Sequence, residues 1–258
     1  MEDFSENVST KIKILNINIQ NITQTDVLKN LSEGFFLTPN VDNLMRLQKD
    51  REFYEIYRSA DWVVCDSKIV MLGSKFLGTP LKETIPGSSF FTEYCFYHRN
   101  NEKVKIFLLG AAEGVAEKAM QNINNRIGRN IVVGAHSPSF GFEKNEVECE
   151  EIVRLINVTD ANVLLVGASA PKQEKWIYKY KNQITNVKLF MALGATIDFE
   201  AGNVKRAPKI FQKLALEWFF RMCSDPKRLV KRYLIDDLPF FYYLMKQKLG
   251  LYKNPFET

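Results

Sequence analysis

Apolar segments that alternate with helical patterns constrain the fold of this 258-residue chain more than any other feature. Four such segments lie between residues 104 and 193, and each is followed by a helical pattern or a loop. They cover residues 104–110, 131–134, 162–167 and 187–193. Nearly continuous apolar runs of this length are typical of parallel strands whose two faces are both covered by helices. The sequence therefore predicts an α/β fold with a mostly parallel sheet.

The first third of the chain extends this pattern. Residues 11–19 alternate between polar and apolar side chains, which predicts one half-exposed strand. Two more strands are expected at residues 34–38 and 62–65, with helices over residues 41–60 and 68–77. Together these segments complete a Rossmann-like sheet with helices on both faces.

Basic residues concentrate in the last fifth of the chain. Residues 205–258 contain twelve Lys/Arg and five Asp/Glu, whereas the rest of the chain contains 23 and 25. From Ala207 onward the pattern is helical and rich in aromatic residues. We therefore expect an α/β core over residues 1–204 and a basic helical appendage over residues 205–258. Composition alone leaves three roles open for the appendage: a solvated helical pair, an anchor at a membrane surface, or a nucleic-acid patch.

Composition also excludes several classes of site. The four cysteines form no CxxC pair, which favours reduced, buried thiols in a cytosolic protein. Only two histidines occur, so a histidine-rich zinc site is excluded and a histidine-based triad is improbable. The acidic, polar start does not match a signal peptide, and no run of 18 apolar residues occurs. Any membrane contact is therefore expected to be peripheral.

Glycines and polar residues follow several of the expected strands. Gly110 and Gly167 lie at strand-to-helix turns, where free N–H groups favour a phosphate. Neither turn matches GxGxxG or the P-loop, so the use of NAD or ATP is weakly supported. Such turns also form simply to pack a helix on a strand, and the residues alone leave both interpretations open.

Asp66 follows a buried strand and precedes a helix, so its carboxylate should emerge at the carboxyl edge of the sheet. Taken alone, this position favours a helix N-cap, although a general base is an alternative. Thr38 and Asn40 end the strand before it and offer short hydrogen-bonding groups, or else form a turn around Pro39.

The chain resembles the WecB/TagA/CpsF glycosyltransferases over roughly residues 12–250. The resemblance is carried by residues 167–176, 193–208 and 216–229, and by the Thr-x-Asn sequence at Thr38. It implies an inverting glycosyltransferase that moves a sugar from a UDP-sugar to a polyprenyl-diphosphate-linked saccharide. It also implies that the sugar is of the N-acetylmannosamine or uronic-acid type and that the product feeds a bacterial surface polymer.

The resemblance also implies roles for individual residues. Asp66 corresponds to the aspartate thought to act as general base. Residues expected to bind the donor or acceptor sugar are Thr38, Asn40, Gly110, Gly167, Gln173, Glu174, Asp198 and Arg206. Residues expected to bind lipid or diphosphate in the appendage are Arg221, Arg228, Lys231 and Arg232. In the family this basic end helps membrane association and closes over the active site.

Three positions depart from the family pattern. Thr84 stands where better-known relatives carry an arginine that could neutralise the donor diphosphate, and Ser89 stands where they carry an aspartate. Ser67 stands where a glycine usually follows the catalytic aspartate. Lys82, Arg206 or an appendage arginine is expected to supply the missing charge.

No D-x-D sequence occurs, and the nearest string is Asp198-Phe199-Glu200. Its two carboxylates would face together only on an extended strand. The family resembled has no obligatory metal, so we expect no metal site and no cofactor.

Two other functions remain open from the sequence. One is a non-catalytic sugar-nucleotide-binding scaffold of a polymer-assembly complex, suggested by the Thr84 and Ser67 departures. The other is a nucleotide-binding enzyme acting on RNA, which the basic tail alone would allow. The favoured interpretation has no nucleic-acid partner and places the protein in the cytoplasm, peripherally on the inner face of the cell membrane. It leaves a homo-oligomer open.

Overall fold

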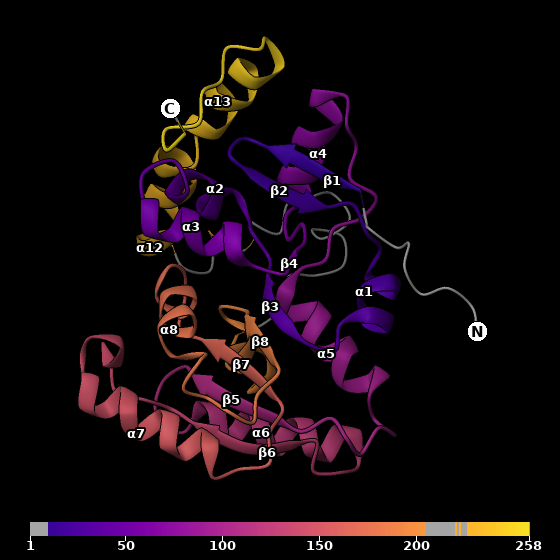
Figure 1. The fold of residues 1–258 in the computed structure, drawn as a ribbon, viewed down its shortest axis with the longest axis vertical. Helices are drawn as coiled ribbons and strands as arrows, with labels where there is room; N and C mark the ends of the chain where they lie inside the picture. The colour runs from indigo at the N-terminus through magenta and orange to yellow at the C-terminus, as the bar shows by residue number, and fades with distance from the viewer. Residues whose placement is uncertain (1–9, 205–219, 221, 223–225, 258) are drawn as a thin grey trace.

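The computed structural model describes residues 10–204, 220, 222 and 226–257. Its centre is a six-stranded parallel sheet in the order β4-β3-β8-β7-β5-β6, which confirms the expected α/β class (Figure 1). The strands are β3 (Gly34–Leu37), β4 (Trp62–Val63), β5 (Ile106–Gly110), β6 (Val132–His136), β7 (Val163–Gly167) and β8 (Leu189–Ala192).

Alternate residues of each strand enter two hydrophobic clusters, one on each face of the sheet. In β3, Phe35 and Leu37 join one cluster and Phe36 joins the other, and the remaining long strands alternate in the same way. Both faces are therefore buried, as the continuous apolar runs predict.

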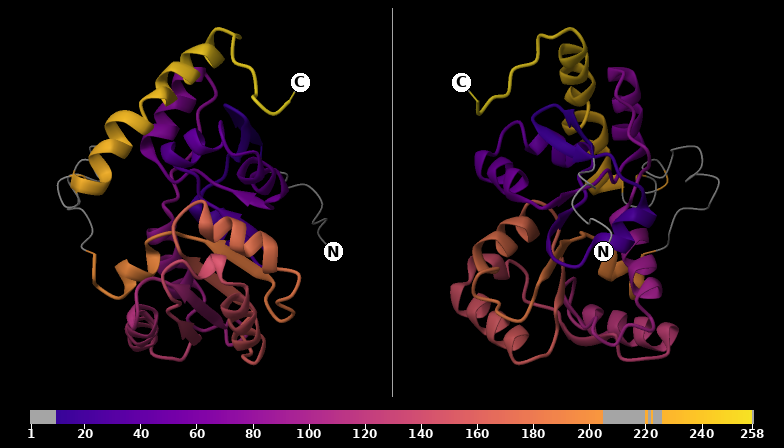
Figure 2. Two further views of the ribbon diagram at one scale, coloured as in Figure 1. Left: turned by 90° about the vertical axis from the view of Figure 1, so that its left-hand side faces the viewer. Right: turned by 45° about the vertical axis from the view of Figure 1, so that its right-hand side comes forward.

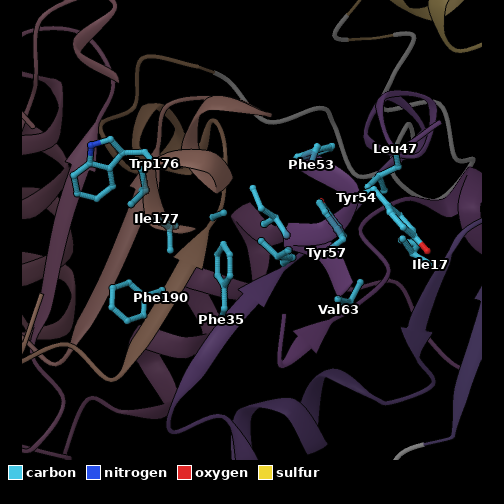
Figure 3. Close-up of a cluster of buried hydrophobic side chains, with 14 of the residues drawn as sticks. Ile17, Phe35, Leu47, Phe53, Tyr54, Tyr57, Val63, Trp176, Ile177 and Phe190 are labelled. Carbon is cyan, nitrogen blue, oxygen red and sulfur yellow. The ribbon is translucent and has the colours of Figure 1, made fainter. Parts of the chain in front are cut away.

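Helices on one side of the sheet contribute to the first cluster. They are α2 (Val41–Arg46), α3 (Arg51–Ser59), α4 (Lys68–Leu77), α7 (Glu146–Asn157), α8 (Lys172–Tyr180) and α13 (Pro239–Lys248), and α13 packs on α2 and α4. Figure 3 shows the middle of this cluster, where Trp176 and Ile177 of α8 lie on one side of Phe35 and Phe53 and Tyr57 of α3 lie on the other. The other face is covered by α1 (Gln24–Asn30), α5 (Gly87–Tyr97), α6 (Val115–Ile127) and α9 (Thr196–Glu200).

The expected single strand over residues 11–19 is wrong. These residues form an antiparallel hairpin of β1 (Lys11–Ile14) and β2 (Ile17–Gln20). The polar–apolar alternation runs through both strands, and no glycine marks the turn. Leu15 takes the left-handed conformation instead (φ 53°), and the Asn16 amide donates to the Leu47 carbonyl at 2.6 Å. The turn is thus held from outside the hairpin.

The helix expected over residues 41–60 divides at Asp50, whose carboxylate accepts the Phe53 N–H at 3.0 Å and caps α3. Helix α5 was not expected from the sequence, because it begins with Pro86-Gly87-Ser88-Ser89 and continues in aromatic residues that favour strands.

The end of the chain packs against the first half of the molecule (Figure 2). The appendage contains α12 (Pro226–Lys231), a π-helical turn η2 (Arg232–Asp236) and α13. Phe240 and Leu244 of α13 are buried, and a Cβ added at Gly73 of α4 would lie 3.2 Å from each. The helical pattern predicted from Ala207 to Asp225 lies almost wholly outside the described residues, so the boundary at residue 204 stays a prediction.

Candidate active site

Thr38 and Asp66 follow β3 and β4 at the carboxyl edge of the sheet, where the Asp66 N–H donates to the Pro39 carbonyl at 3.3 Å. The Gly87 N–H, at the start of α5, donates to Asp66 Oδ1 at 2.9 Å. A Cβ added at Gly87 would lie 3.0 Å from Thr38 Oγ1 and 2.8 Å from a Leu193 methyl group. Glycine at position 87 therefore lets the first turn of α5 approach both Asp66 and Thr38. The partial positive charge of a helix N-terminus favours a negative group at this point.

The N-cap interpretation of Asp66 is wrong. Ser67 is the N-cap of α4, and its hydroxyl oxygen accepts the Ile69 N–H at 3.2 Å. The departure from the family glycine therefore has a structural explanation, because Ser67 performs the capping and Asp66 turns toward α5.

Asn40 begins α2 and also meets the appendage. Its Oδ1 accepts the Asn43 N–H at 3.1 Å, and the Asn43 Oδ1 accepts the Asn40 N–H at 3.2 Å, which forms a capping box. An Nη2 of Arg232 lies 3.5 Å from the same Asn40 oxygen and 3.2 Å from Asp42. Asp42 is nearly buried and also pairs with Arg46 at 3.0 Å. One appendage arginine therefore reaches the turn after β3.

The appendage also brings a buried carboxyl group, that of Asp237, close to Asp42. Burial, together with the nearby Asp42, raises the pKa of Asp237 to about 7, and its buried Oδ1 has no hydrogen-bond partner. Neither this group nor the Asp42–Arg46–Arg232 cluster was anticipated from the sequence. The pattern Asn40-Val41-Asp42-Asn43 does signal a helix start, but nothing in it indicates a distant arginine.

The turns after β5, β7 and β8 meet backbone to backbone. A Cβ added at Gly110 would lie 2.4 Å from the Gly167 carbonyl oxygen, and one at Gly167 would lie 2.7 Å from the Gly194 carbonyl oxygen. The Ala111 N–H donates to the Gly167 carbonyl at 3.1 Å. Close packing alone thus accounts for glycine at positions 110 and 167. A ligand role for these turns stays a prediction.

Gln173 joins two of these turns. Its Oε1 accepts the Gly194 N–H at 2.9 Å, and its Nε2 donates to Glu174 Oε1 at 3.1 Å. The side chain is only 3% exposed. Gln173 therefore holds the turn after β8 against α8, and its direct contact with a sugar or phosphate stays a prediction.

Glu174 is buried beside Gln173 at the start of α8. It is 2% exposed, and its Oε2 has no hydrogen-bond partner. Burial raises the pKa of Glu174 to about 7, and nearby Asp42 raises it further, while Gln173 and Arg46 oppose the shift. Helix α8 directs the side chain into the protein, near Arg46 and Asp42, and the expected contact of Glu174 with substrate stays a prediction.

Asp198 and Glu200 lie on the helix α9 and not on a strand. Residues two apart on a helix point in different directions. The Glu200 carboxylate is already engaged by Thr92 at 2.6 Å and by Arg126 at 2.5 Å. The extended chelating pair considered from the sequence is therefore wrong. Within residues 10–204 and the described part of the appendage, His, Cys, Asp and Glu form no group of three suited to a metal ion.

The expected basic residues are only partly placed. Arg206 and Arg221 lie outside the described residues, as does the side chain of Arg228. Lys231 is exposed, and Arg232 is the one described above beside Asn40.

Comparison with known proteins shows which family the chain belongs to. The model of the glycosyl transferase WecG/TagA/CpsF family matches residues 12–254. This chain belongs to that family. As a WecG/TagA/CpsF glycosyltransferase it has characterised relatives in Staphylococcus aureus. One, from strain MRSA252, is named N-acetylglucosaminyldiphosphoundecaprenol N-acetyl-beta-D-mannosaminyltransferase. It is 31% identical over 245 residues, which cover 91% of this chain and 92% of that protein. A relative of the same name from strain MW2 is 30% identical over the same length.

Family membership identifies the chain as a glycosyltransferase, as the sequence predicts. The comparisons give no support to the scaffold or the RNA-directed enzyme. Among the residues that the structure describes, no helix has the length and apolar character needed to cross a membrane.

Proposed function

We propose that this chain transfers an N-acetylmannosamine-type sugar from a UDP-sugar to a polyprenyl-diphosphate-linked N-acetylglucosamine. The proposal is supported mainly by the position of Asp66 in a chain of this family. Its carboxylate accepts the Gly87 N–H, and Thr38 lies against the same glycine. The names of the two relatives support the acceptor and the sugar. The product would feed a bacterial surface polymer.

In the reaction we propose, Asp66 takes the proton from the attacking acceptor hydroxyl. The hydroxyl oxygen bonds to C1 of the sugar, the bond from C1 to the diphosphate breaks on the opposite face, and UDP leaves with inversion. A positioned base of this kind typically contributes about 10²–10⁴-fold to the rate. The Gly87 N–H fixes one carboxylate oxygen, and so orients the carboxylate toward the acceptor.

Arg232 is our candidate for the charge that Thr84 does not supply. Its guanidinium already lies at the turn after β3, where Asp42 orients it at 3.2 Å. Arginine offers several N–H donors to a phosphate, so one group can pair with Asp42 while others meet the leaving diphosphate. Thr84 itself lies just before α5 and carries no charge.

We further propose that α4 and α13 rest on the membrane surface. The two helices pack together, and both expose large apolar side chains. Those on the two helices are Leu72, Phe76, Phe241, Tyr242 and Met245, each at least 45% exposed. Lys246 and Lys248 lie over the Tyr242 and Phe76 rings at 5.2 and 5.8 Å. Aromatic and apolar side chains bordered by lysines fit an anionic lipid interface.

The transfer is tested by UDP release from a panel of UDP-sugars, with and without lipid-diphosphate-linked N-acetylglucosamine. We expect release with UDP-N-acetylmannosamine that depends on the acceptor, and most of that activity should persist in excess EDTA. Release with every sugar and no acceptor would contradict the proposed transfer. Loss in EDTA that Mg²⁺ restores would contradict metal independence alone.

Flotation on vesicles containing phosphatidylglycerol tests the membrane surface separately. Replacing Lys231, Lys246 and Lys248 by Ala should weaken binding by about a hundredfold, since each contributes about 1 kcal/mol. The matched control replaces Lys103, Lys144 and Lys179, which carry the same charge on another part of the surface. Equal flotation of the two variants would contradict the proposal that this surface binds the membrane.

A further inference from the structure

The guanidinium of Arg232 has acceptors for only part of its hydrogen-bonding capacity. Its Nη2 lies 3.2 Å from Asp42 Oδ2 and 3.5 Å from Asn40 Oδ1. The same Asp42 oxygen is shared with the Nε of Arg46 at 3.0 Å. The Nε of Arg232 is buried, and it donates to no group in the part of the chain that the structure describes. Because an unpaired buried donor is unfavourable, a second acceptor within reach would compete with Asp42 for this guanidinium.

Such an acceptor lies one turn further along the chain. The Asp237 N–H donates to the Arg232 carbonyl at 2.8 Å, which is the i to i+5 bond of the π-helical turn η2. Asp237 is 8% exposed, and its buried Oδ1 accepts no hydrogen bond from the described residues. Its carboxyl group is close enough to Arg232 for the two charges to interact. The turn therefore carries an unpaired donor and an unpaired acceptor near each other.

A proton on Asp237 explains why the two groups are unpaired. An ionised carboxylate forms strong, charge-assisted hydrogen bonds with a guanidinium. A neutral carboxyl group competes poorly with the carboxylate of Asp42, so the arginine stays with Asp42. Burial and the nearby Asp42 raise the pKa of Asp237 to about 7, and Arg232 opposes this shift. The carboxyl group of Asp237 is therefore neutral below this pH and charged above it.

The charges around Asp237 favour one bound proton. The charged groups that act on it come from α2 and from its own turn, and they are Asp42, Arg46, Arg232 and Asp236. With Asp237 itself, these make three carboxyl groups against two arginines, so one bound proton balances their charge. Glu174 of α8 is acted on by the same Asp42 and Arg46. The helices α4 and α13, by contrast, bury residues without charge: Val70, Gly73, Ser74, Phe240 and Leu244.

We propose that Asp237 is a positioning residue and that its proton decides which acceptor holds Arg232. With the proton bound, Arg232 stays at the turn after β3, beside Asp42 and Asn40. When the proton leaves to solvent, the Asp237 carboxylate accepts the Arg232 Nε–H and draws the guanidinium away from that turn. Arg232 is thus withdrawn as the pH rises. The inference goes beyond the proposed transfer, and only its effect on activity rests on the role proposed for Arg232.

The test is an NMR titration, from about pH 5 to 9, of the full chain labelled at aspartate carboxyl carbons and arginine nitrogens. The two signals are identified by their absence from Asp237→Asn and Arg232→Lys. We expect the Asp237 carboxyl carbon and the Arg232 Nε of wild type to change together, with one midpoint at about 7. In Asp237→Asn the Arg232 Nε signal should not change with pH. The matched control is Asp236→Asn, which removes the exposed carboxylate next to Asp237 and should keep both transitions.

An activity profile separates this inference from the proposed function. Wild type and Asp237→Asn should have equal kcat/KM at about pH 6, because asparagine resembles the neutral carboxyl group. At about pH 8.5 wild type should be lower by about tenfold, which corresponds to one hydrogen bond to a charged group.

Two results would overturn the inference. One is an Asp237 midpoint at about 4, the ordinary value for aspartate, and the other is an Arg232 signal that does not follow Asp237. Coupled signals with equal activity profiles would uphold the inference and contradict the role of Arg232 at the diphosphate instead.

Discussion

The two halves of the sheet's carboxyl edge are built differently. At β3 and β4 the chain presents polar and charged side chains, with Asp66 on the Gly87 N–H and Arg232 on Asp42. At β5, β7 and β8 it presents backbone, with Gly110 against Gly167 and Gly167 against Gly194. We infer that the first half performs the chemistry, and that the second shapes the surface on which the rest of the donor lies. Substitutions in the first half should therefore mainly lower activity, and substitutions in the second half should mainly lower stability.

The largest effect is expected on the glycine side. Gly110→Ala would place a Cβ 2.4 Å from a carbonyl oxygen at a residue with φ +131°, so backbone would have to move. We expect a loss of more than 3 kcal/mol in the free energy of unfolding, measured by urea denaturation. Gly128→Ala is the matched control, because it also has positive φ (+80°) but meets nothing within 4 Å. It should cost about 1 kcal/mol. Equal losses would contradict close packing of the strand ends.

A pH-dependent effect is expected from Glu174, which lies buried behind the same turns. Its folded pKa, about 7, is higher than the ordinary value of about 4.3, so the folded state binds more protons between these values. Stability should therefore decrease as the pH rises from about 4.5 through 7. Glu174→Gln removes the titration and should be more stable than wild type at pH 8 by on the order of 2 kcal/mol. Near pH 4.5 the two should be alike.

Thermal unfolding at pH 4.5, 6 and 8 measures this difference. Other titrating groups, Asp237 among them, are common to both proteins and cancel. A gap between wild type and Glu174→Gln that stays constant over this range would mean that Glu174 does not titrate there.

A smaller effect is expected from Arg232 on the charged side. Arg232→Gln removes the cation beside Asn40 but leaves Asp42 its other partner, Arg46. We expect kcat/KM to fall about tenfold with little change in stability. Arg154→Gln, an exposed arginine on α7, is the control. If Arg232→Gln unfolds at a lower temperature and keeps its kcat/KM, the arginine is a packing element and the diphosphate has another partner.

The sequence predicts the sheet well and the site less completely. Continuous apolar runs specify the buried strands, because burial on both faces requires that composition. The position of Asp66 at the edge of the sheet is predictable because it comes directly after such a run. The pairing of Arg232 with Asp42 joins residues 190 positions apart, and no local pattern encodes it. The β1–β2 turn at Leu15 and the burial of Glu174 likewise depend on neighbours that only the folded chain supplies.

If the β3–β4 side carries the chemistry, Asp66→Asn should abolish most of the turnover without loss of the fold. The asparagine oxygen can still accept the Gly87 N–H, so the site should keep its shape while losing the base. We expect UDP affinity to stay within about twofold and turnover to fall by about a hundredfold or more. Asp160→Asn, an exposed aspartate paired with Lys105, should retain wild-type turnover. Wild-type turnover in a correctly folded Asp66→Asn protein would remove Asp66 from the mechanism and contradict the division of the edge.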